Sequence, residues 1–409
     1  MKKLLLVVLI LFFVNDTRAT HLMGGEITWE CIKSGNKAGQ YVFQLKAYRD
    51  CQGIALPEDS IFLATHNIAS ISSITLYNSS VTDLSPNCDT LDGPNSEFSC
   101  GPSNTGFSGN GNGAVEEHIY RSDTIRILGA PDANGWHFTW GSCCRNNAIT
   151  NLNNPNAGFT LRAVMYPFTD SLGVTYPNND DCYDSSPKFY EKPRTILEVN
   201  NGYDPVSLTN GFTYSHNAYD QEQDSIVYEW GIPIDNSYDY LNPTSSAITF
   251  LSPYSYTSPI NGITLNSTTG RTSYPADIQG NYVTCTKVSA YKCGDLVTEI
   301  YREIQVVLIP PTCNLGDTTN GNFGADTLCN VRPFVQPPFY YAGAINPYQW
   351  DTLVHCGDTV SFNFTASDND YYPNGTQQDL LFEVSGGQFY NYNDGIPCQT
   401  PPCATFEEL

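Results

Sequence analysis

Apolar and polar residues alternate along much of this chain of 409 residues, as they do in half-buried β-strands. In QYVFQLKAY (40–48), for example, Tyr41, Phe43, Leu45 and Ala47 alternate with more polar neighbours. The pattern predicts strands at 24–32, 40–49, 70–78, 115–128, 135–141 and 158–166. No stretch shows a convincing helical period, so the hydrophobic pattern predicts an all-β protein.

A longer β-hairpin is predicted near residue 300. One face of LVTEIYREIQVVLI (296–309) carries Leu296, Ile300, Ile304, Val306 and Leu308. The turn residues Cys293, Gly294 and Asp295 stand directly before this stretch. They predict that 281–293 pairs with 296–309.

Composition agrees with short strands joined by turns, because the chain has 27 Tyr, 20 Phe, 26 Pro and 32 Gly. Length and proline positions indicate several units. The expected units are an N-terminal β-sandwich module at 20–168, a linker at 169–192, a second domain at 193–309 and a partial third domain at 312–409. An Asp cluster followed by an alternating strand occurs in both 215–230 and 364–387, which favours tandem β-sandwich domains.

The N-terminus is typical of a secretory signal peptide. Basic residues at 2–3 precede the apolar run 4–14, and a site of small residues allows cleavage after Ala19. The apolar run is about half of the ~20 residues that a membrane-spanning helix needs, and no later segment approaches that length. We therefore expect removal of 1–19, no transmembrane segment in the mature chain, and an extracellular or cell-surface location.

The net charge of −23 narrows the choice of partners. Such a chain would repel phosphate backbones and anionic lipid surfaces, which excludes a nucleic-acid-binding role. Divalent cations remain compatible with it.

All 14 cysteines follow the signal peptide, and an even number in an exported chain favours disulfides. The adjacent pair Cys143 and Cys144, in GSCCRN (141–146), raises the alternatives of a zinc ligand or a catalytic thiol. Zinc sites usually use paired C-x-x-C ligands, which are missing here. A catalytic thiol needs a nearby base, and the sequence does not show whether His118 or His137 approaches Cys144. Disulfide bonding is the preferred interpretation.

Further disulfides are expected from spacing. Cys398 and Cys403 flank a Pro-Pro turn and are predicted to close a short loop, and Cys313 with Cys329 a longer one. Cys285 and Cys293 are too far apart on one extended strand to pair with each other. They are expected to find partners elsewhere.

Three motifs of the first unit carry a resemblance to a known group of proteins: THLMGGEITW (20–29), YRDC (48–51) and WHFTWGSCCRNNAITNL (136–152). Together they resemble the N-terminal module of large exported proteins of Bacteroidetes, often labelled gliding-motility-associated or type IX secretion cargo. The second unit resembles their cadherin-like or immunoglobulin-like (PKD-type) repeats, and 350–388 does so more loosely. Such proteins usually continue to a C-terminal sorting domain, whereas this chain ends at Leu409 within an unfinished unit.

The resemblance implies stacked, disulfide-bonded β-sandwiches at the cell surface, delivered by the export machinery. It implies no active site. The adjacent cysteines of the family match Cys143 and Cys144, and Cys51 of YRDC is the expected partner of one of them.

The acidic clusters predict calcium sites, because calcium takes six to eight oxygen ligands. Asp220, Glu222 and Asp224 form the first candidate, and Asp368 with Asp370 the second. The alternative is that these residues only form turns and protect edge strands from aggregation.

No H-E-x-x-H, G-x-S-x-G or Walker motif occurs, and we expect a protein that is not an enzyme. The predicted function is adhesion or gliding motility at the cell surface, with polysaccharide or protein ligands. The alternative is a secreted carbohydrate-binding module, in which exposed Tyr and Trp side chains would stack on sugars.

Overall fold

The computed structural model describes residues 22–51, 53, 55–84, 115–178, 181–193, 196–198, 211–275, 278–309, 334–345, 347–350, 352–355, 357–367, 380 and 403–405. Within these ranges the chain is all-β, as the hydrophobic pattern predicts, and its one short helical turn is a 3-10 turn at Gly35–Lys37. The described part contains no helix long and apolar enough to cross a membrane.

One large sheet contains β1 (Leu22–Cys31), β2 (Tyr41–Asp50), β3 (Ser60–His66), β4 (Ser73–Asp83), β5 (Val115–Ser122), β6 (Trp136–Ser142), β7 (Phe159–Met165), β11 (Ile196–Glu198), β14 (Ser225–Trp230), β17 (Gly280–Lys292) and β18 (Asp295–Ile309). Small sheets pair β8 (Phe168–Thr169) with β9 (Thr175–Tyr176), β10 (Lys188–Phe189) with β13 (Ala218–Tyr219), and β16 (Arg271–Pro275) with both β12 (Gly211–Ser215) and β15 (Thr264–Leu265). Nearer the C-terminus, β19 (Phe334–Gln336) pairs with β22 (Thr365–Ser367), and β20 (Phe339–Tyr340) with β21 (Tyr348–Gln349).

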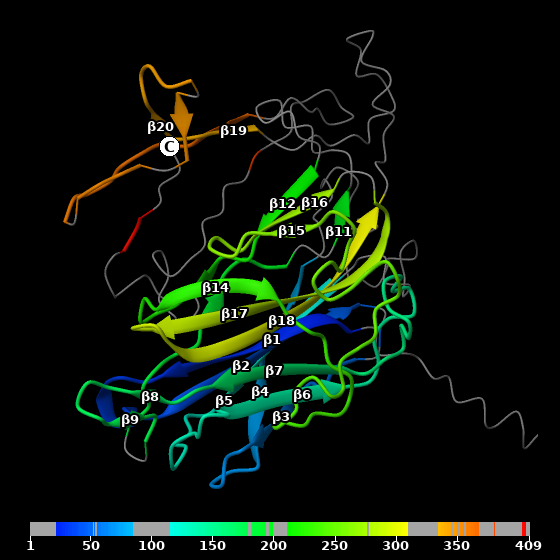
Figure 1. Ribbon diagram of the computed structural model, residues 1–409, viewed down its shortest axis with the longest axis vertical. Coiled ribbons are helices and arrows are strands. Elements are labelled where there is room, and N and C mark those ends of the chain that lie inside the picture. The colour runs from blue at the N-terminus through cyan, green and yellow to red at the C-terminus, as the bar shows by residue number, and fades with distance from the viewer. Residues whose placement is uncertain are drawn as a thin grey trace, which may run out of the picture.

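Eight strands of the large sheet form a closed ring in the order β1, β2, β5, β4, β3, β6, β7, β18, with β18 pairing back to β1. Every neighbouring pair in the ring is antiparallel. The long strand β18 closes the ring, since one of its edges pairs first with β7 and then with β1. Its other edge carries β17, which in turn carries β14 (Figure 1).

Two glycines of the THLMGGEITW motif allow this closure. Gly24 has φ +151°, and a Cβ there would overlap the carbonyl oxygen of Glu303 in β18. A Cβ on Gly25 would lie 2.5 Å from the carbonyl oxygen of Lys46 in β2. Since real Cβ atoms do not approach backbone so closely, only glycine fits where β1 lies between its two neighbours.

Aromatic side chains fill the main hydrophobic cluster. Trp29, Phe43 and Phe138 come from three different strands of the ring and are almost fully buried. Their ring centroids lie 4.6 to 6.2 Å apart in tilted arrangements. Burial of each such side chain contributes roughly 1.5–3 kcal/mol, so the cluster is a major source of stability.

The ring joins the first and second predicted units. The second unit, 193–309, supplies β18, which pairs with β7 and β1 of the first unit, 20–168. Ile300 and Val288 also belong to the same hydrophobic cluster as Trp29. In the described residues the two units are therefore connected by both backbone pairing and a shared core.

The motif around GSCCRN packs against the closing hairpin. Arg145 and Glu303 are buried, and the guanidinium Nε and Nη2 donate to the two carboxylate oxygens of Glu303 at 2.8 Å each. Asn151 is fully buried and bonds to the backbone of Val283 through both its oxygen and its nitrogen, at 3.0 and 2.9 Å. These contacts fix 145–151 on β17 and β18.

One disulfide joins distant parts of the chain. Cys31 at the end of β1 is bonded to Cys182, which lies in the predicted linker 169–192. The bond holds the segment after residue 182 beside the end of β1.

The sulfur atoms of Cys143 and Cys144 are directly adjacent, and the pairing of one of these residues with Cys51 stays a prediction. Cys51 is itself disulfide-bonded. Cys285 is a buried free thiol and Cys293 an exposed one at the hairpin turn, so the expectation that these two find partners is wrong.

Cys403 is disulfide-bonded, but the predicted partner Cys398 and the pair Cys313 and Cys329 lie outside the described residues.

Candidate cation site

The loop between β13 and β14 carries the first predicted acidic cluster. It turns tightly because Gln223 adopts a left-handed conformation with φ +63°, and its N–H donates to the carbonyl oxygen of Asp220 at 3.2 Å. The N–H of Asp224 donates to Asp220 Oδ1 at 3.0 Å. An Asp that accepts a backbone N–H of its own loop is a common turn former. Here it brings the carboxylates of Asp220 and Asp224 together.

A third carboxylate comes from Asp184, far away in the sequence. The hydroxyls of Ser185 and Ser186 accept the backbone N–H groups of Cys31 and Trp29 at 3.0 and 2.9 Å, and Trp29 Nε1 donates to the carbonyl oxygen of Asp184 at 3.0 Å. These bonds and the nearby disulfide fix the segment along the end of β1. One carboxylate oxygen from each of Asp184, Asp220 and Asp224 then lies within 4.8 Å of the others.

The three carboxylates have little solvent and few partners. Asp220 is 3% exposed and Asp184 is 5% exposed. The Oδ2 atoms of Asp184, Asp220 and Asp224 are buried and have no hydrogen-bond partner among the described residues. One amine reaches them: Lys292 Nζ lies 2.8 Å from Asp224 Oδ1 and 3.3 Å from Asp184 Oδ1.

Burial and the closeness of the acidic groups change the pKa values of these carboxylates. Burial raises the pKa of Asp220 to about 7, with a further contribution from the charges of Glu222 and Asp224. Burial also raises the pKa of Asp184, together with repulsion from Glu222, Asp220 and Asp224. Burial and mutual repulsion therefore disfavour the ionised form of these carboxylates unless a cation lies beside them.

Glu222 takes a different position from the one expected. Its Oε1 accepts the hydroxyl of Ser185 at 3.1 Å and lies 3.4 Å from Lys33 Nζ. The structure therefore brings together two of the three predicted residues, and Asp184 completes the trio. The second predicted cluster, Asp368 and Asp370, lies outside the described residues.

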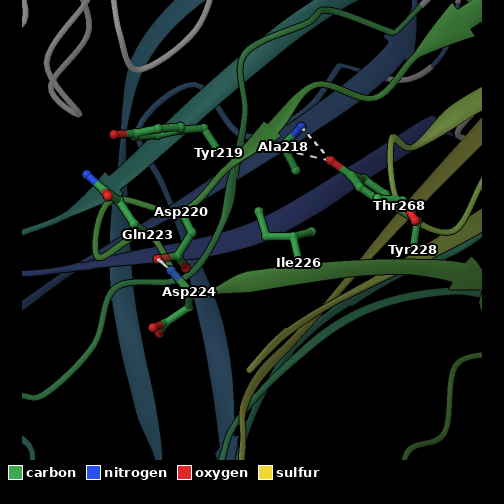
Figure 2. Close-up of a pocket in the computed structure, with 8 residues that line it drawn as sticks. All are labelled: Ala218, Tyr219, Asp220, Gln223, Asp224, Ile226, Tyr228 and Thr268. Atoms are coloured by element: carbon green, nitrogen blue, oxygen red, sulfur yellow. Dashed lines mark hydrogen bonds between the residues drawn. The ribbon is translucent and has the colours of Figure 1, made fainter. Parts of the chain in front are cut away.

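An open pocket of about 380 Å³ lies beside the carboxylates. Asp220 and Asp224 line one side, and Tyr228 and Thr268 lie on the other (Figure 2). The Tyr228 hydroxyl accepts the N–H of Ala218 at 3.1 Å, which fixes the far wall. The pocket therefore has an acidic side and an apolar, aromatic side.

Stacked aromatic rings lie close to the same carboxylates. Tyr183 stacks on Phe168 and on Tyr176, with ring centroids 4.9 and 4.8 Å apart. The amines of Lys33 and Lys292 lie 5.6 and 5.3 Å from the Tyr183 ring centroid. Aromatic and charged groups therefore meet around this site.

The site lies at the end of the sheet opposite to the chain's entry and exit. β1 begins at Leu22 beside the last part of β18, since Gly24 faces Ile304. Asp224 and Lys292 lie where β14 starts and β17 ends, at the left in Figure 1. The 15 residues of β18, at roughly 3.3 Å per residue, separate the two ends by up to about 50 Å.

The histidines considered as bases for a Cys144 thiol have other partners. His118 Nε2 lies 2.6 Å from Glu116 Oε1, and His137 Nδ1 lies 2.7 Å from the Tyr238 hydroxyl. Cys144 itself is in a disulfide. These contacts do not assemble a thiol and a base.

No protein-family model matches the chain, and no curated protein or solved structure matches it either. The functional argument therefore rests on the chain's own residues and geometry.

Proposed function

We propose that this chain is a non-enzymatic exported protein that acts at the outer cell surface in adhesion or gliding motility. The signal-like N-terminus, the all-β architecture and the aromatic, acidic composition support an extracellular role. Its partners in this proposal are polysaccharides or proteins outside the cell, together with the machinery that exports it.

The observation that carries the proposal is the position of the two chain ends of the folded body. Leu22 and Ile309 lie at the same end of the sheet, because β1 and β18 are antiparallel neighbours. A body attached through sequence beyond Ile309 would present the opposite end outward. That end carries the open pocket, the Tyr183 stack and the carboxylates.

The finer architecture is also part of the proposal. We infer tandem immunoglobulin-like or cadherin-like (PKD-type) sandwiches from the resemblance of 20–309 to gliding-motility-associated and type IX secretion cargo proteins. The shared ring of strands makes the first two units act as one body, which suits a rigid surface module.

A secreted carbohydrate-binding module is the second candidate. The stack of Phe168, Tyr183 and Tyr176 at the outward end favours it, because Tyr176 and Tyr183 are partly exposed there and partly exposed aromatic side chains bind sugar rings. In this case the product would be free in the medium and would bind one class of polysaccharide.

Location and phenotype test the first proposal. Protease treatment of intact cells, followed by mass spectrometry, should release peptides from 22–309, and deletion of the coding sequence should reduce attachment or gliding. Recovery of the protein only from the medium, with attachment and gliding unchanged by deletion, would contradict an adhesive role.

Binding of the full chain to purified polysaccharides separates the two candidates. A saturable affinity that Tyr176→Ala reduces at least about tenfold, and that an exposed control such as Tyr256→Ala leaves unchanged, would support the carbohydrate-binding module. Equal binding by both variants would exclude a sugar site at the aromatic stack.

A further inference from the structure

We propose that Asp184, Asp220 and Asp224 bind one calcium ion, which joins the segment after Cys182 to the loop between β13 and β14. This site differs from the sequence-predicted one by the exchange of Glu222 for Asp184. The inference goes beyond the proposed surface role and does not depend on it.

Buried oxygens without partners point to a missing ligand. Asp184 and Asp220 are more than nine-tenths buried, and each directs a carboxylate oxygen into the cluster while its Oδ2 lacks a hydrogen-bond donor among the described residues. The loop adds two more buried oxygens without donors there, Gln221 Oε1 and Glu222 Oε2. Buried polar atoms are nearly always paired, so such a concentration of acceptors indicates a cation.

The local charges give the same result. Four carboxylates, those of Asp184, Asp220, Glu222 and Asp224, share the amines of Lys33 and Lys292. When all four are ionised, two negative charges remain unbalanced, and one divalent cation would neutralise them.

The ligand set favours calcium over magnesium. The three carboxylate oxygens come from two separate segments of the chain and lie within 4.8 Å of one another. Calcium accepts six to eight oxygen ligands at about 2.3–2.6 Å in flexible geometry. Magnesium requires a near-ideal octahedron and releases its waters reluctantly, so a cluster of protein carboxylates suits it less well.

Lys292 and the ion can occupy the site together. The amine contacts the Oδ1 atoms of Asp224 and Asp184, whereas the Oδ2 atoms of both residues are without donors among the described residues. Its positive charge nevertheless opposes a second cation nearby. Lys292 therefore lowers the calcium affinity while it stabilises the site without calcium.

Calcium titration of the purified full chain, freed of metal with EDTA, tests the proposal by isothermal calorimetry and thermal unfolding. Calcium should bind with a stoichiometry of one at this site and raise the melting temperature by at least about 3 °C, and equal magnesium should raise it less. Asp184→Asn should weaken binding at least about tenfold. Lys292→Met should strengthen it.

Matched variants separate a ligand from a structural residue. Asp239→Asn removes one exposed carboxylate whose Oδ1 accepts a loop N–H, and it should change the affinity less than about twofold. Glu222→Gln should have a smaller effect than Asp184→Asn.

Three results would overturn the proposal. The first is a melting temperature of the wild type that does not respond to 10 mM calcium, a concentration about tenfold above the millimolar range of weak extracellular sites. The second is an affinity of Asp184→Asn equal to that of the wild type. If Asp184→Asn does not fold, unchanged calcium binding by Asp224→Asn would overturn it equally.

Discussion

Closure of the strand ring depends on the absence of a side chain at Gly24, and Gly24→Ala tests this directly. The added Cβ would overlap the Glu303 carbonyl oxygen and would lie 3.0 Å from the Ile304 Cα. Both contacts are with backbone atoms of β18, which cannot rotate away as a side chain can. β1 would have to withdraw from β18.

The expected loss of unfolding free energy in Gly24→Ala has two parts. A non-glycine residue at φ +151° carries backbone strain of about 1–3 kcal/mol. Withdrawal of β1 also weakens the pairing of Gly24 with Ile304 and of Gly25 with Glu303, at about 0.5–1.5 kcal/mol for each hydrogen bond lost. We expect a loss of about 3–5 kcal/mol, which is a large part of the 5–15 kcal/mol typical of a folded domain.

Urea unfolding followed by tryptophan fluorescence measures the loss, because Trp29 is buried in the ring's core. Gly129→Ala is the matched control: Gly129 has φ +101°, but a Cβ there would meet nothing within 4 Å. The control should lose only the strain contribution. If both variants lose the same free energy within about 0.5 kcal/mol, the close approach of β1 and β18 is not what requires glycine.

Three further predictions concern buried groups. Cys293 should react with a thiol reagent in the native protein, whereas Cys285, whose burial raises its thiol pKa, should react only after unfolding; equal reaction rates would contradict the burial. Burial lowers the pKa of His216, so the unfolded chain binds a proton that the folded chain does not, and as the pH falls below about 6.5 the wild type should lose stability relative to His216→Gln by up to about 1.4 kcal/mol per pH unit. Parallel unfolding free energies of the two proteins between pH 7.5 and 5.5 would refute this. Arg145→Leu should lower the unfolding free energy in urea by about 3–5 kcal/mol, because it leaves the buried Glu303 carboxylate without its partner. The double variant Arg145→Leu/Glu303→Leu should recover most of this loss. No recovery would mean that the loss comes from packing rather than from an unpaired charge.

Much of the local structure follows from the sequence. The alternation in 40–49 corresponds to β2, and the turn at Cys293 to Asp295 separates β17 from β18 as predicted. Both signals are local, because alternation and turn residues act over a few positions. The strand at 60–66 is absent from the sequence-based prediction, although Ile61 and Leu63 are buried.

The partners of the strands are not predictable in the same way. Alternation determines which face of a strand is buried but not which strand lies beside it. The pairing of β1 with β18 depends on two adjacent glycines whose need becomes visible only when the neighbouring carbonyl is in place. For this reason the sequence indicates separate units where the structure has a shared ring.

The cation site has the same limitation. A search for acids close together in the sequence finds Asp220, Glu222 and Asp224, but it cannot tell that Glu222 turns away from the other two. Asp184 reaches the cluster because the Cys31–Cys182 disulfide and the hydrogen bonds of the two following serines hold its segment beside the end of β1. The acidic residues around Cys182 were a signal in the sequence, because a disulfide at this cysteine can place them beside a distant strand.

The strand that closes the ring also sets the order in which the chain can fold. β1 is among the first segments to be synthesised, but its partner β18 follows only after all the intervening strands of the ring. Until then Gly24 and Gly25 have no β18 beside them, and the aromatic core has an open side. Contacts over such separations form slowly, because a long loop must close first. A chain of this design completes its core only after the last strand of the ring has been synthesised.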